Sequence, residues 1–395
     1  MNSKTIGVFF GSRSAEHDIS IITAQLAISG LKGLDYNIVP VYISRDGIWM
    51  IDDELGRLAT FTDPKKDVSK ENRYKQYYLD LENSNGKLTF KKKGLRGKSV
   101  TIDLAFPTFH GTFGEDGTIQ GLFEMFNVPY VGCDVASSAL AMDKVLVKQM
   151  CEIHGIPTTK YIYFYNKDWK ENKKYILERA KKELKFPVFV KPVHLGSSIG
   201  IAKVNDFKDL EDKIEVALYY DNKVLVEEGI TDLMDVTCCL LGNEDLEASL
   251  LQESVFKSDF FDFDEKYINE GGAQIGNNEN GLAIPARLDK EMTRNIQDTA
   301  KEVFKVLGCS GIARVDFLIS KKTNNFYIAE VNPMPGTLYL HIWEPSGIDI
   351  NELLKRLIEL AENKHKQKQD INYSFSSSFL TNLNGSKLGK GKKLG

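Results

Sequence analysis

The feature that most constrains the fold is a pair of strand-like segments within residues 311–332, separated by a polar turn. In each segment apolar residues alternate with polar or charged ones, as in a strand with one face in a core. If the two segments pair symmetrically about the turn, Arg314 lies opposite Asn332, and Asp316 lies opposite Glu330. All four side chains then share one face of the predicted hairpin.

This arrangement indicates a cation site. Like charges directly opposite each other destabilise a sheet unless something neutralises them. The carboxylates of Asp316 and Glu330 and the amide oxygen of Asn332 are the hard oxygen ligands that Mg²⁺ prefers. The adjacent Arg314 could meet a transferring phosphoryl group or an oxyanion. The alternative is a half-exposed hairpin in which Arg314 forms only a diagonal ion pair.

A second candidate segment, residues 187–200, combines a strand with a loop rich in glycine and serine. Lys191 ends the strand, and the backbone N–H groups of Gly196, Ser197 and Ser198 could approach an anion. A strand is predicted after the loop where a Walker A motif needs a helix, so the loop is not of that type. The alternative is a flexible hairpin tip.

Two other charged groups are ambiguous from their pattern. Lys144 and Lys148 lie one helical turn apart, where a solvated helix face is the usual interpretation. Glu227 and Glu228 end a predicted strand. They could hold an adenine edge or a ribose, or merely finish the strand.

The order of predicted elements indicates an α/β fold that begins with an open parallel sheet. A strand at 5–10, a helix at about 18–31 and a strand at 36–43 alternate at the start. Single helices are expected at about 137–154 and 289–307. The predicted units are an N-terminal α/β domain at 1–134 with a surface insertion at about 60–100, a central subdomain at 135–230, a C-terminal subdomain at 231–364 and a flexible tail at 365–395.

Composition narrows the class of protein. Among 395 residues, 51 Lys and Arg against 55 Asp and Glu give a charge of -4, which offers no global attraction to nucleic acid or anionic membrane. No apolar run approaches the roughly 18 residues of a membrane span. The five cysteines show no metal-ligand spacing. We therefore expect a cytoplasmic enzyme with free thiols and with neither a nucleic-acid nor a membrane partner.

A series of longer motifs follows in order along residues 5–360. They are Gly11–Ser20 (GSRSAEHDIS), Phe109–Gly121 (FHGTFGEDGTIQG), Met142–Lys144, Val190–Pro192, Gly196–Ser198, Glu265–Tyr267, Ile284–Ala286, Arg314–Phe317 and Glu330–Gly336. Together they resemble the D-alanine–D-alanine ligase family of the ATP-grasp superfamily. The resemblance implies a three-domain ATP-grasp fold with ATP between the central and C-terminal subdomains, and a cytoplasmic homodimer that makes peptidoglycan precursors.

The resemblance also implies a mechanism and a set of roles. MgATP phosphorylates the carboxylate of a first amino acid, and the amine of a second amino acid attacks the resulting acyl phosphate. Two Mg²⁺ ions, or Mn²⁺ in their place, are held by Asp316, Glu330 and Asn332. The nucleotide is held by Lys144, Lys191, Gly196, Ser197, Ser198, Glu227, Glu228, Asp235 and Lys266. Arg314 and the backbone N–H of Gly336 stabilise the oxyanion.

The first substrate has its own implied residues. Glu16 binds its ammonium and joins Ser197 and Tyr267 in a hydrogen-bonded triad, and His110 lies near its carboxylate. The alternatives are a structural histidine at 110 and, at Glu16, an acid favoured by a helix N-terminus. Tyr267 stands where relatives that form an ester with D-lactate tend to carry histidine, so it indicates an amine acceptor.

Two positions depart from the family pattern. Asp235 stands where a glutamate usually meets the ribose. His341 stands where a serine usually receives the acceptor's carboxylate, and an imidazole is larger and can carry charge near neutral pH. We therefore expect D-alanine to be a poor second substrate and a different, larger amine to be preferred. The alternative is that the segment around His341 only packs and the carboxylate is bound elsewhere.

Three functions are compatible with these residues. The first is an ATP-dependent ligase of cell-wall precursor synthesis that joins D-alanine to D-alanine. The second is a ligase of a specialised pathway with another acceptor. The third is a nucleotide-binding regulator without turnover, against which the complete set of Arg314, Asp316, Glu330 and Asn332 argues.

Overall fold

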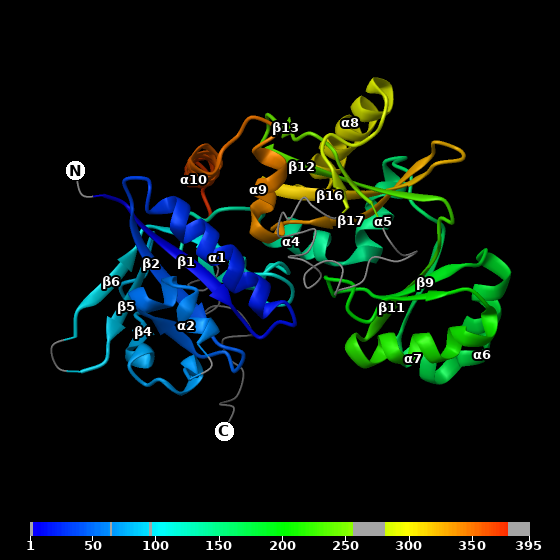
Figure 1. Ribbon diagram of the computed structural model, residues 1–395. Helices are drawn as coiled ribbons and strands as arrows, with labels where there is room; N and C mark the ends of the chain where they lie inside the picture. The colour runs from blue at the N-terminus through cyan, green and yellow to red at the C-terminus, as the bar shows by residue number, and fades with distance from the viewer. Residues whose placement is uncertain (1–2, 64, 95–96, 256–280, 378–395) are drawn as a thin grey trace.

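The structure is a computed structural model that describes residues 3–63, 65–94, 97–255 and 281–377. Within these residues the chain forms four β-sheets with helices packed on them. Figure 1 shows the N-terminal part at the left and the part around β9 and β11 at the lower right. The part around β12, β16 and β17 lies above and between them.

The N-terminal sheet has the strand order β3-β2-β1-β7, in which β1 pairs parallel with both β2 and β7. Its strands are β1 (Thr5–Gly11), β2 (Asn37–Ile43), β3 (Trp49–Ile51) and β7 (Leu104–Pro107). Helix α1 (His17–Leu31) packs on it because Ala24, Ala27 and Ile28 join a core with apolar residues of β1. The predicted open parallel α/β start is confirmed.

The segment expected as a surface insertion is partly buried. Strands β4 (Tyr77–Leu79), β5 (Leu88–Lys92) and β6 (Ser99–Ile102) form a small antiparallel sheet. Leu88 and Phe90 lie in the same core as Phe9 of the parallel sheet, so this part of the surface prediction is wrong. The short helices nearby are η1 (Asp53–Gly56), α2 (Ala59–Thr62), η2 (Val68–Lys70), η3 (Tyr74–Gln76) and α3 (Thr118–Met125).

The central sheet is antiparallel with the order β10-β9-β11-β8. Its strands are β8 (Tyr161–Tyr165), β9 (Val188–Pro192), β10 (Ala202–Val204) and β11 (Lys223–Glu228). Helices α6 (Asn166–Glu183) and α7 (Leu210–Tyr220), with the 3₁₀ turn η4 (Phe207–Asp209), lie beneath it in Figure 1. Both helices contribute to its core, α6 through Trp169 and Ile176 and α7 through Ile214.

The C-terminal sheet carries the predicted hairpin. Its main path is β15-β14-β12-β16-β17, with β13 paired to β12. Its strands are β12 (Leu233–Gly242), β13 (Glu247–Ala248), β14 (Gln252–Ser254), β15 (Leu282–Ala283), β16 (Gly311–Ser320) and β17 (Phe326–Asn332). Helix α8 (Lys290–Val306) packs on it as expected, through Ile296, Val303 and Phe304.

The helix expected at 137–154 is two helices, α4 (Val135–Met142) and α5 (Lys144–Ile153). Asp143 separates them because it has an extended backbone and its carboxylate accepts from the N–H groups of Val145 and Leu146, each at 2.9 Å. This is an N-cap, and it directs the following lysine, Lys144, toward the central sheet.

The last elements join the N- and C-terminal parts. They are η8 (Gly336–Tyr339), α9 (Leu340–Trp343) and α10 (Ile350–Gln369). Leu353, Leu354 and Leu357 of α10 lie in the same core as α1 and β1. Among the described helices, none combines the length and the apolar character that crossing a membrane requires. We propose domain boundaries near residues 134 and 230, because no sheet of the described residues contains strands from both sides of either of them. The tail expected from residue 365 begins later, because α10 continues to Gln369.

Candidate active site

The hairpin has the predicted register over its polar residues. Arg314 pairs with Asn332, and Asp316 pairs with Glu330, before a bulge follows Asp316. Directly opposite residues of neighbouring strands share a face. Strand β12 extends the row, because Thr237 pairs with Asp316 and donates a hydrogen bond to its Oδ1 at 2.8 Å.

Arg314, Asp316, Glu330 and Asn332, here called the hairpin cluster, are tightly connected. The Nε and Nη2 atoms of Arg314 donate to Asp316 at 2.9 and 2.6 Å, and Nη2 lies 3.4 Å from Glu330 Oε1. The amide of Asn332 is satisfied when its Oδ1 accepts from Arg314 Nη2 at 2.7 Å. Burial alone would lower the pKa of Arg314, but Asp316 and Glu330 raise it well above its usual value. The guanidinium therefore stays charged.

The donor chemistry of the hairpin cluster fits Mg²⁺. Two carboxylates and an amide oxygen are hard oxygen ligands, and Mg²⁺ is usually bound by one or two carboxylates together with substrate phosphates and water. Among the described residues no group of three or more His, Cys, Asp or Glu side chains could hold a metal alone. A metal here therefore depends on Asn332 and on oxygens from a ligand.

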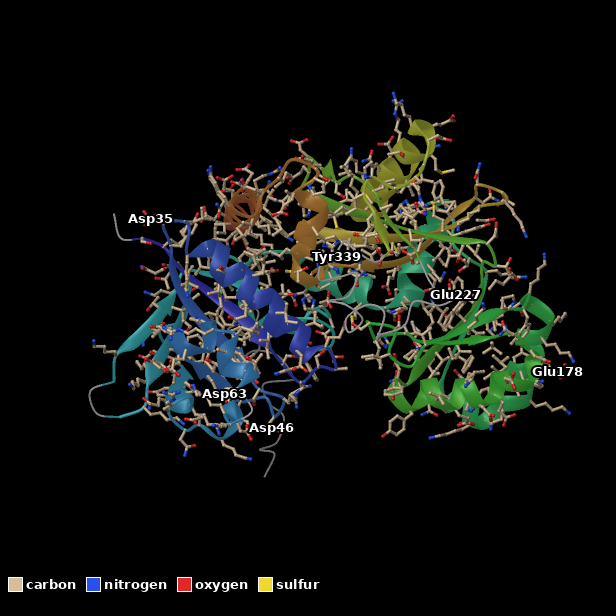
Figure 2. The ribbon with its side chains drawn as sticks, viewed as in Figure 1. Asp35, Asp46, Asp63, Glu178, Glu227 and Tyr339 are labelled. Atoms are coloured by element: carbon tan, nitrogen blue, oxygen red, sulfur yellow. The ribbon has the colours of Figure 1, made fainter. Side chains whose placement is uncertain are left out.

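A second charged set faces this one from the central sheet and α5. Lys148, Lys191 and Glu227, here called the lysine cluster, are almost fully buried, with side-chain exposures of 1 %, 14 % and 2 %. Glu227 accepts from Lys148 Nζ at 2.7 Å and also pairs with Lys191. The prediction that Lys148 lies on a solvated helix face is therefore wrong. Glu227 lies on β11 and Lys148 lies on α5; Glu227 is labelled in Figure 2.

Two lysines hold the carboxylate of the lysine cluster ionised. Burial alone would raise the pKa of Glu227, but Lys148 and Lys191 lower it well below its usual value. Burial alone would lower the pKa of Lys191, yet Glu227, Glu330 and Asp235 raise it. Glu227 therefore fixes the positions of the two lysines, and the alternative that it merely ends its strand is wrong.

Lys144 links the hairpin cluster to the backbone just before the glycine- and serine-rich loop. Its Nζ donates to the backbone oxygen of Leu195 at 2.7 Å and lies 3.5 Å from Glu330 Oε2. The side chain is buried. It therefore lies between the metal-ligand candidates and the loop expected over the phosphates, as a phosphate-binding lysine must.

That loop, Gly196–Ser198, is called the phosphate loop from here on. Ser197 and Ser198 adopt positive φ angles of 53° and 58°, which is uncommon for residues other than glycine and is often stabilised at binding sites. The Ser197 hydroxyl donates to the Glu16 carboxylate. A Cβ atom at Gly196 would lie 2.6 Å from the same carboxylate, so a larger residue there would displace the Glu16 side chain from Ser197. The structure thus brings together the predicted partners Glu16 and Ser197.

The N-terminal domain adds a neutral histidine. His110 is fully buried, and its Nε2 shares a 2.8 Å hydrogen bond with Thr23 Oγ1. Burial, with a smaller effect of Arg314, lowers the pKa of His110 to about 3. Thr23 also accepts from the backbone N–H of Thr337 at 2.9 Å. These contacts join α1 to the turn that follows β17.

Glu115 is a residue whose role the sequence did not reveal. It lies within the Phe109–Gly121 motif and is buried, and its Oε2 accepts from the Gly111 N–H at 2.6 Å. Burial and the nearby Glu16 raise the pKa of Glu115 to about 8. It is therefore a neutral acid at pH 7. Its place in the motif was a signal, but its protonation state depends on burial.

The turn after β17 contains Gly336 and three successive residues with positive φ, Thr337, Leu338 and Tyr339, at 50°, 53° and 52°. Left-handed backbone costs about 1 kcal/mol or more per residue other than glycine, and such strain clusters at functional sites. The turn places the Tyr339 ring 4.9 Å from the Arg314 guanidinium. Figure 2 shows Tyr339 beside α9.

His341 lies on α9, beside the row of paired residues Gln252, Thr237 and Asp316 that crosses the C-terminal sheet and is here called the sheet row. Its Nε2 is 2.7 Å from Gln252 Oε1, and Gln252 pairs with Thr237 in the row that leads to Asp316. Burial and Arg314 lower the pKa of His341 to about 4. The expectation that this imidazole could carry charge near neutral pH is therefore wrong. Its Nδ1 is a buried atom without a hydrogen-bond partner.

Of the remaining predicted residues, two lie farther from the clusters and two lie outside the part of the chain that the structure describes. Glu228 accepts from the Lys185 N–H at 2.9 Å at the end of β11. Asp235 lies on β12 between Ser254 and Leu318, two residues before Thr237. Lys266 and Tyr267 lie outside the described residues.

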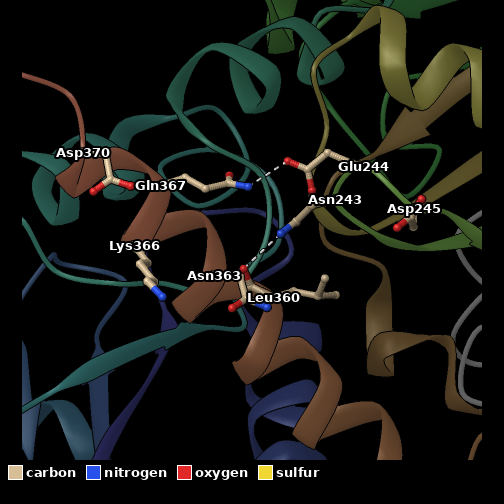
Figure 3. A pocket seen from close by; sticks show the side chains of 8 residues that line it. All are labelled: Asn243, Glu244, Asp245, Leu360, Asn363, Lys366, Gln367 and Asp370. Carbon is tan, nitrogen blue, oxygen red and sulfur yellow. Dashed lines mark hydrogen bonds between the residues drawn. The ribbon is translucent and has the colours of Figure 1, made fainter.

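One cavity lies away from these residues. A polar groove of about 450 Å³ runs between α10 and the turn after β12 (Figure 3). Asn243 donates to the Leu360 oxygen and Gln367 donates to Glu244 across it, each at 3.1 Å. None of the predicted site residues lines it, so it is not the candidate active site.

Comparison with known proteins identifies the family. The family model described as D-ala D-ala ligase N-terminus matches residues 5–133, and the one described as D-ala D-ala ligase C-terminus matches residues 150–359. The chain is 40% identical over 385 residues to the D-alanine–D-alanine ligase of Thermosipho melanesiensis, covering 98% of this chain and 99% of that one. It is 36% identical to the same enzyme of Caldicellulosiruptor bescii, covering 95% and 99%.

Solved structures agree. The D-alanine–D-alanine ligase of Coxiella burnetii superposes with a TM-score of 0.76 at 30% identity, covering 94% of this chain and 97% of that one. The VanG D-Ala:D-Ser ligase of Enterococcus faecalis superposes with a TM-score of 0.74 at 31% identity, covering 91% of this chain and 99% of that one. With both family models matched over most of its length, the chain belongs to the D-alanine–D-alanine ligase family of ATP-dependent ligases.

Proposed function

We propose that the protein activates the carboxylate of D-alanine with ATP and joins it to the amine of a second amino acid. The observation that carries this proposal is that a carboxylate-rich cluster and a lysine-rich cluster, both largely buried, lie on two different sheets, with Lys144 3.5 Å from Glu330 of the first. The hairpin cluster has two carboxylates against one guanidinium, and the lysine cluster has two ammonium groups against one carboxylate. The first suits Mg²⁺ and the second suits phosphates.

The residues then have distinct roles in phosphoryl transfer, which depends mainly on positioning and charge neutralisation. Lys144 and Lys191 would hold phosphates beneath the phosphate loop. Asp316, Glu330 and Asn332 would hold two Mg²⁺ ions, or Mn²⁺ at the same oxygens. When bound, the metal neutralises the charge of the phosphates. Glu228, Asp235 and Lys266 are proposed contacts of the nucleoside.

The first substrate would lie between the N-terminal domain and the hairpin cluster. Glu16, fixed by Ser197, would bind its ammonium, with Tyr267 as the proposed third member of the triad. The neutral His110 would lie near its carboxylate. Arg314 and the Gly336 N–H would stabilise the tetrahedral oxyanion when the acceptor amine attacks.

Phosphate release from ATP tests this function. We expect release that requires both Mg²⁺ and D-alanine, together with a dipeptide identified by mass spectrometry. L-alanine as the sole amino acid is the matched control. Nucleotide binding without phosphate release under any amino acid would contradict the ligase proposal and favour a regulator.

A second candidate concerns the acceptor. Relatives include a structure described as a D-Ala:D-Ser ligase, so the second substrate varies among similar proteins. By the family resemblance, His341 stands where a serine usually lies. Its neutral ring is tilted by 47° against that of Tyr339, with the ring centres 4.7 Å apart, and brings bulk but no charge. We propose that D-alanine is a poor acceptor and that another amine is preferred.

The resemblance to D-alanine–D-alanine ligases supports two further proposals. The protein would be a cytoplasmic homodimer, and its substrates would be small amino acids. Light scattering at several protein concentrations would give the mass of the assembly. A mass of one chain at all concentrations would remove the dimer from the proposal.

A further inference from the structure

His194 is a charged residue that the proposed mechanism does not use. It immediately precedes Leu195, whose backbone oxygen binds Lys144, and stands two residues before the phosphate loop. Its Nδ1 lies 3.0 Å from Asp221 Oδ2, and its Nε2 lies 3.2 Å from Asp143 Oδ2. Both ring nitrogens therefore face carboxylates, which only the imidazolium form satisfies, because it donates from both.

The two carboxylates belong to separate elements. Asp143 caps the N-terminus of α5, and Asp221 lies between α7 and β11 and also accepts from the His194 backbone N–H at 2.7 Å. Lys223 of β11 donates to Asp143 at 2.7 Å. The imidazolium thus ties the start of the phosphate loop to both α5 and β11.

We propose that His194 is a positioning residue for nucleotide binding: its imidazolium holds the phosphate loop and Lys144 in the geometry that receives phosphates. The inference rests on the proposed function, because it assumes that a nucleotide binds at this loop. His194 itself does not touch the nucleotide in this account. It acts through the backbone between Val193 and Gly196.

The charged groups around His194 indicate that nucleotide affinity depends on pH. Asp143 and Asp221 face the ring, Lys223 faces Asp143, and Lys144 lies on the adjoining turn of α5. Hydrogen bonds to Asp143 and Asp221 raise the pKa of His194 to about 9. Because this pKa is raised, the stabilising contacts are complete below the usual 6.5 and are lost as pH rises through about 9.

The experiment measures the affinity for MgADP by calorimetry from pH 6.5 to 10. Wild-type affinity should be constant to about pH 8 and then fall about tenfold, as expected for the loss of a charge-assisted hydrogen bond. His194→Gln should bind about tenfold more weakly at low pH and show no step near pH 9. His194→Arg, which stays charged and can donate to both carboxylates, should retain affinity across the range.

His154→Gln is the matched control, because His154 is an exposed histidine at the other end of α5. It should follow the wild type at every pH. The inference would be overturned if His194→Gln bound MgADP with wild-type affinity and kept the decrease in affinity near pH 9. It would also be overturned if His194→Arg showed the same decrease, because the titrating groups would then be lysines. If wild type binds no MgADP at any pH, the proposed function itself fails, and the inference fails with it.

Discussion

The hairpin cluster and the lysine cluster are both buried sets of charges, yet they are unbalanced in opposite directions. Arg314 faces two carboxylates in the first, whereas Glu227 faces two lysines in the second. Lys144 lies 3.5 Å from Glu330 and offsets part of the negative charge of the hairpin cluster. The opposite composition of the two clusters suits a cation at the first and phosphates at the second. This difference is the basis for the proposal that a metal binds at the hairpin cluster and phosphates bind at the lysine cluster.

The two clusters also differ in what holds them. The hairpin cluster stands on paired strands of one sheet, where register alone fixes the side chains. The lysine cluster joins α5 to β9 and β11, so it depends on how a helix packs against a sheet. Substitutions in the first should therefore affect chemistry most, and substitutions in the second should affect stability as well.

The largest expected effect is on activity in the hairpin cluster. Asp316→Ala or Glu330→Ala should reduce ligation about a thousandfold or more, because a metal ion supplies several kcal/mol of charge stabilisation in the transition state. The fold should persist, as judged by circular dichroism. Glu247→Ala, which removes a half-exposed carboxylate on the same sheet, is the control and should leave activity intact. Turnover retained at saturating Mg²⁺ in either variant would remove the metal assignment.

The next largest effect is on folding in the lysine cluster. Glu227→Ala should lower the free energy of unfolding by about 3–5 kcal/mol, because it leaves two buried lysines without their carboxylate. Urea denaturation measures this change. Glu228→Ala, at the next residue, should cost about 1 kcal/mol or less. Equal effects of the two substitutions would show that the lysine cluster is not a buried ionic unit.

The pH dependence of this contribution follows from the lowered pKa of Glu227. A lowered pKa gives stability that is present above the usual value of 4.5 and is lost only as pH falls through the folded-state pKa. The difference between wild type and Glu227→Ala should therefore be about the same at pH 5 and pH 7. A difference that disappears by pH 5 would contradict the lowered pKa of Glu227.

A smaller effect concerns the acceptor end of the sheet row. His341→Ser should raise kcat/KM for D-alanine as acceptor relative to larger amino acids by about tenfold, since a change of pocket size discriminates by that order. The preference should not change between pH 6 and 8, because the pKa of His341 is lowered to about 4. If D-alanine is already the best acceptor and the substitution changes nothing, His341 does not set specificity.

The last prediction concerns the buried acid Glu115, whose effect appears only when the pH is changed. Since the pKa of Glu115 is raised to about 8, the stability tied to its protonated form is complete below pH 4.5 and is lost as pH rises through 8. Glu115→Gln should therefore gain stability relative to wild type as pH rises from 5 to 9, by about 4 kcal/mol at most, since each pH unit between 5 and the pKa of about 8 contributes about 1.4 kcal/mol. Thermal unfolding at both pH values measures it. A constant difference would show that Glu115 is ionised throughout.

Periodicity was sufficient for the hairpin, because side chains alternate with a period of two and pairing about a short turn fixes which residues meet. The same reasoning was insufficient for Lys148. Helical spacing shows that Lys144 and Lys148 share a face, but not whether that face packs on a sheet. Glu227, the partner of Lys148, lies 79 residues further along the chain, and no local pattern connects the two.

The protonation states at the site could not be predicted from sequence either. His341 was expected to titrate near neutrality, yet burial makes it neutral. Thr23 meets His110 only because α1 packs against the Phe109–Gly121 motif, 87 residues away in sequence. The raised pKa of Glu115 likewise depends on burial and on Glu16, which lies just before α1. Desolvation depends on everything packed around a group, and a motif does not contain that information.

The most direct test of the opposite-charge account is the Mg²⁺ dependence of ADP affinity, measured by calorimetry with and without Mg²⁺ in three proteins. In wild type, Mg²⁺ should strengthen ADP binding. In Glu330→Gln this enhancement should vanish while metal-free ADP binding is retained. In Lys191→Met both affinities should fall together. An equal Mg²⁺ enhancement in Glu330→Gln and wild type would contradict the assignment of the metal to the hairpin cluster and of the phosphates to the lysine cluster.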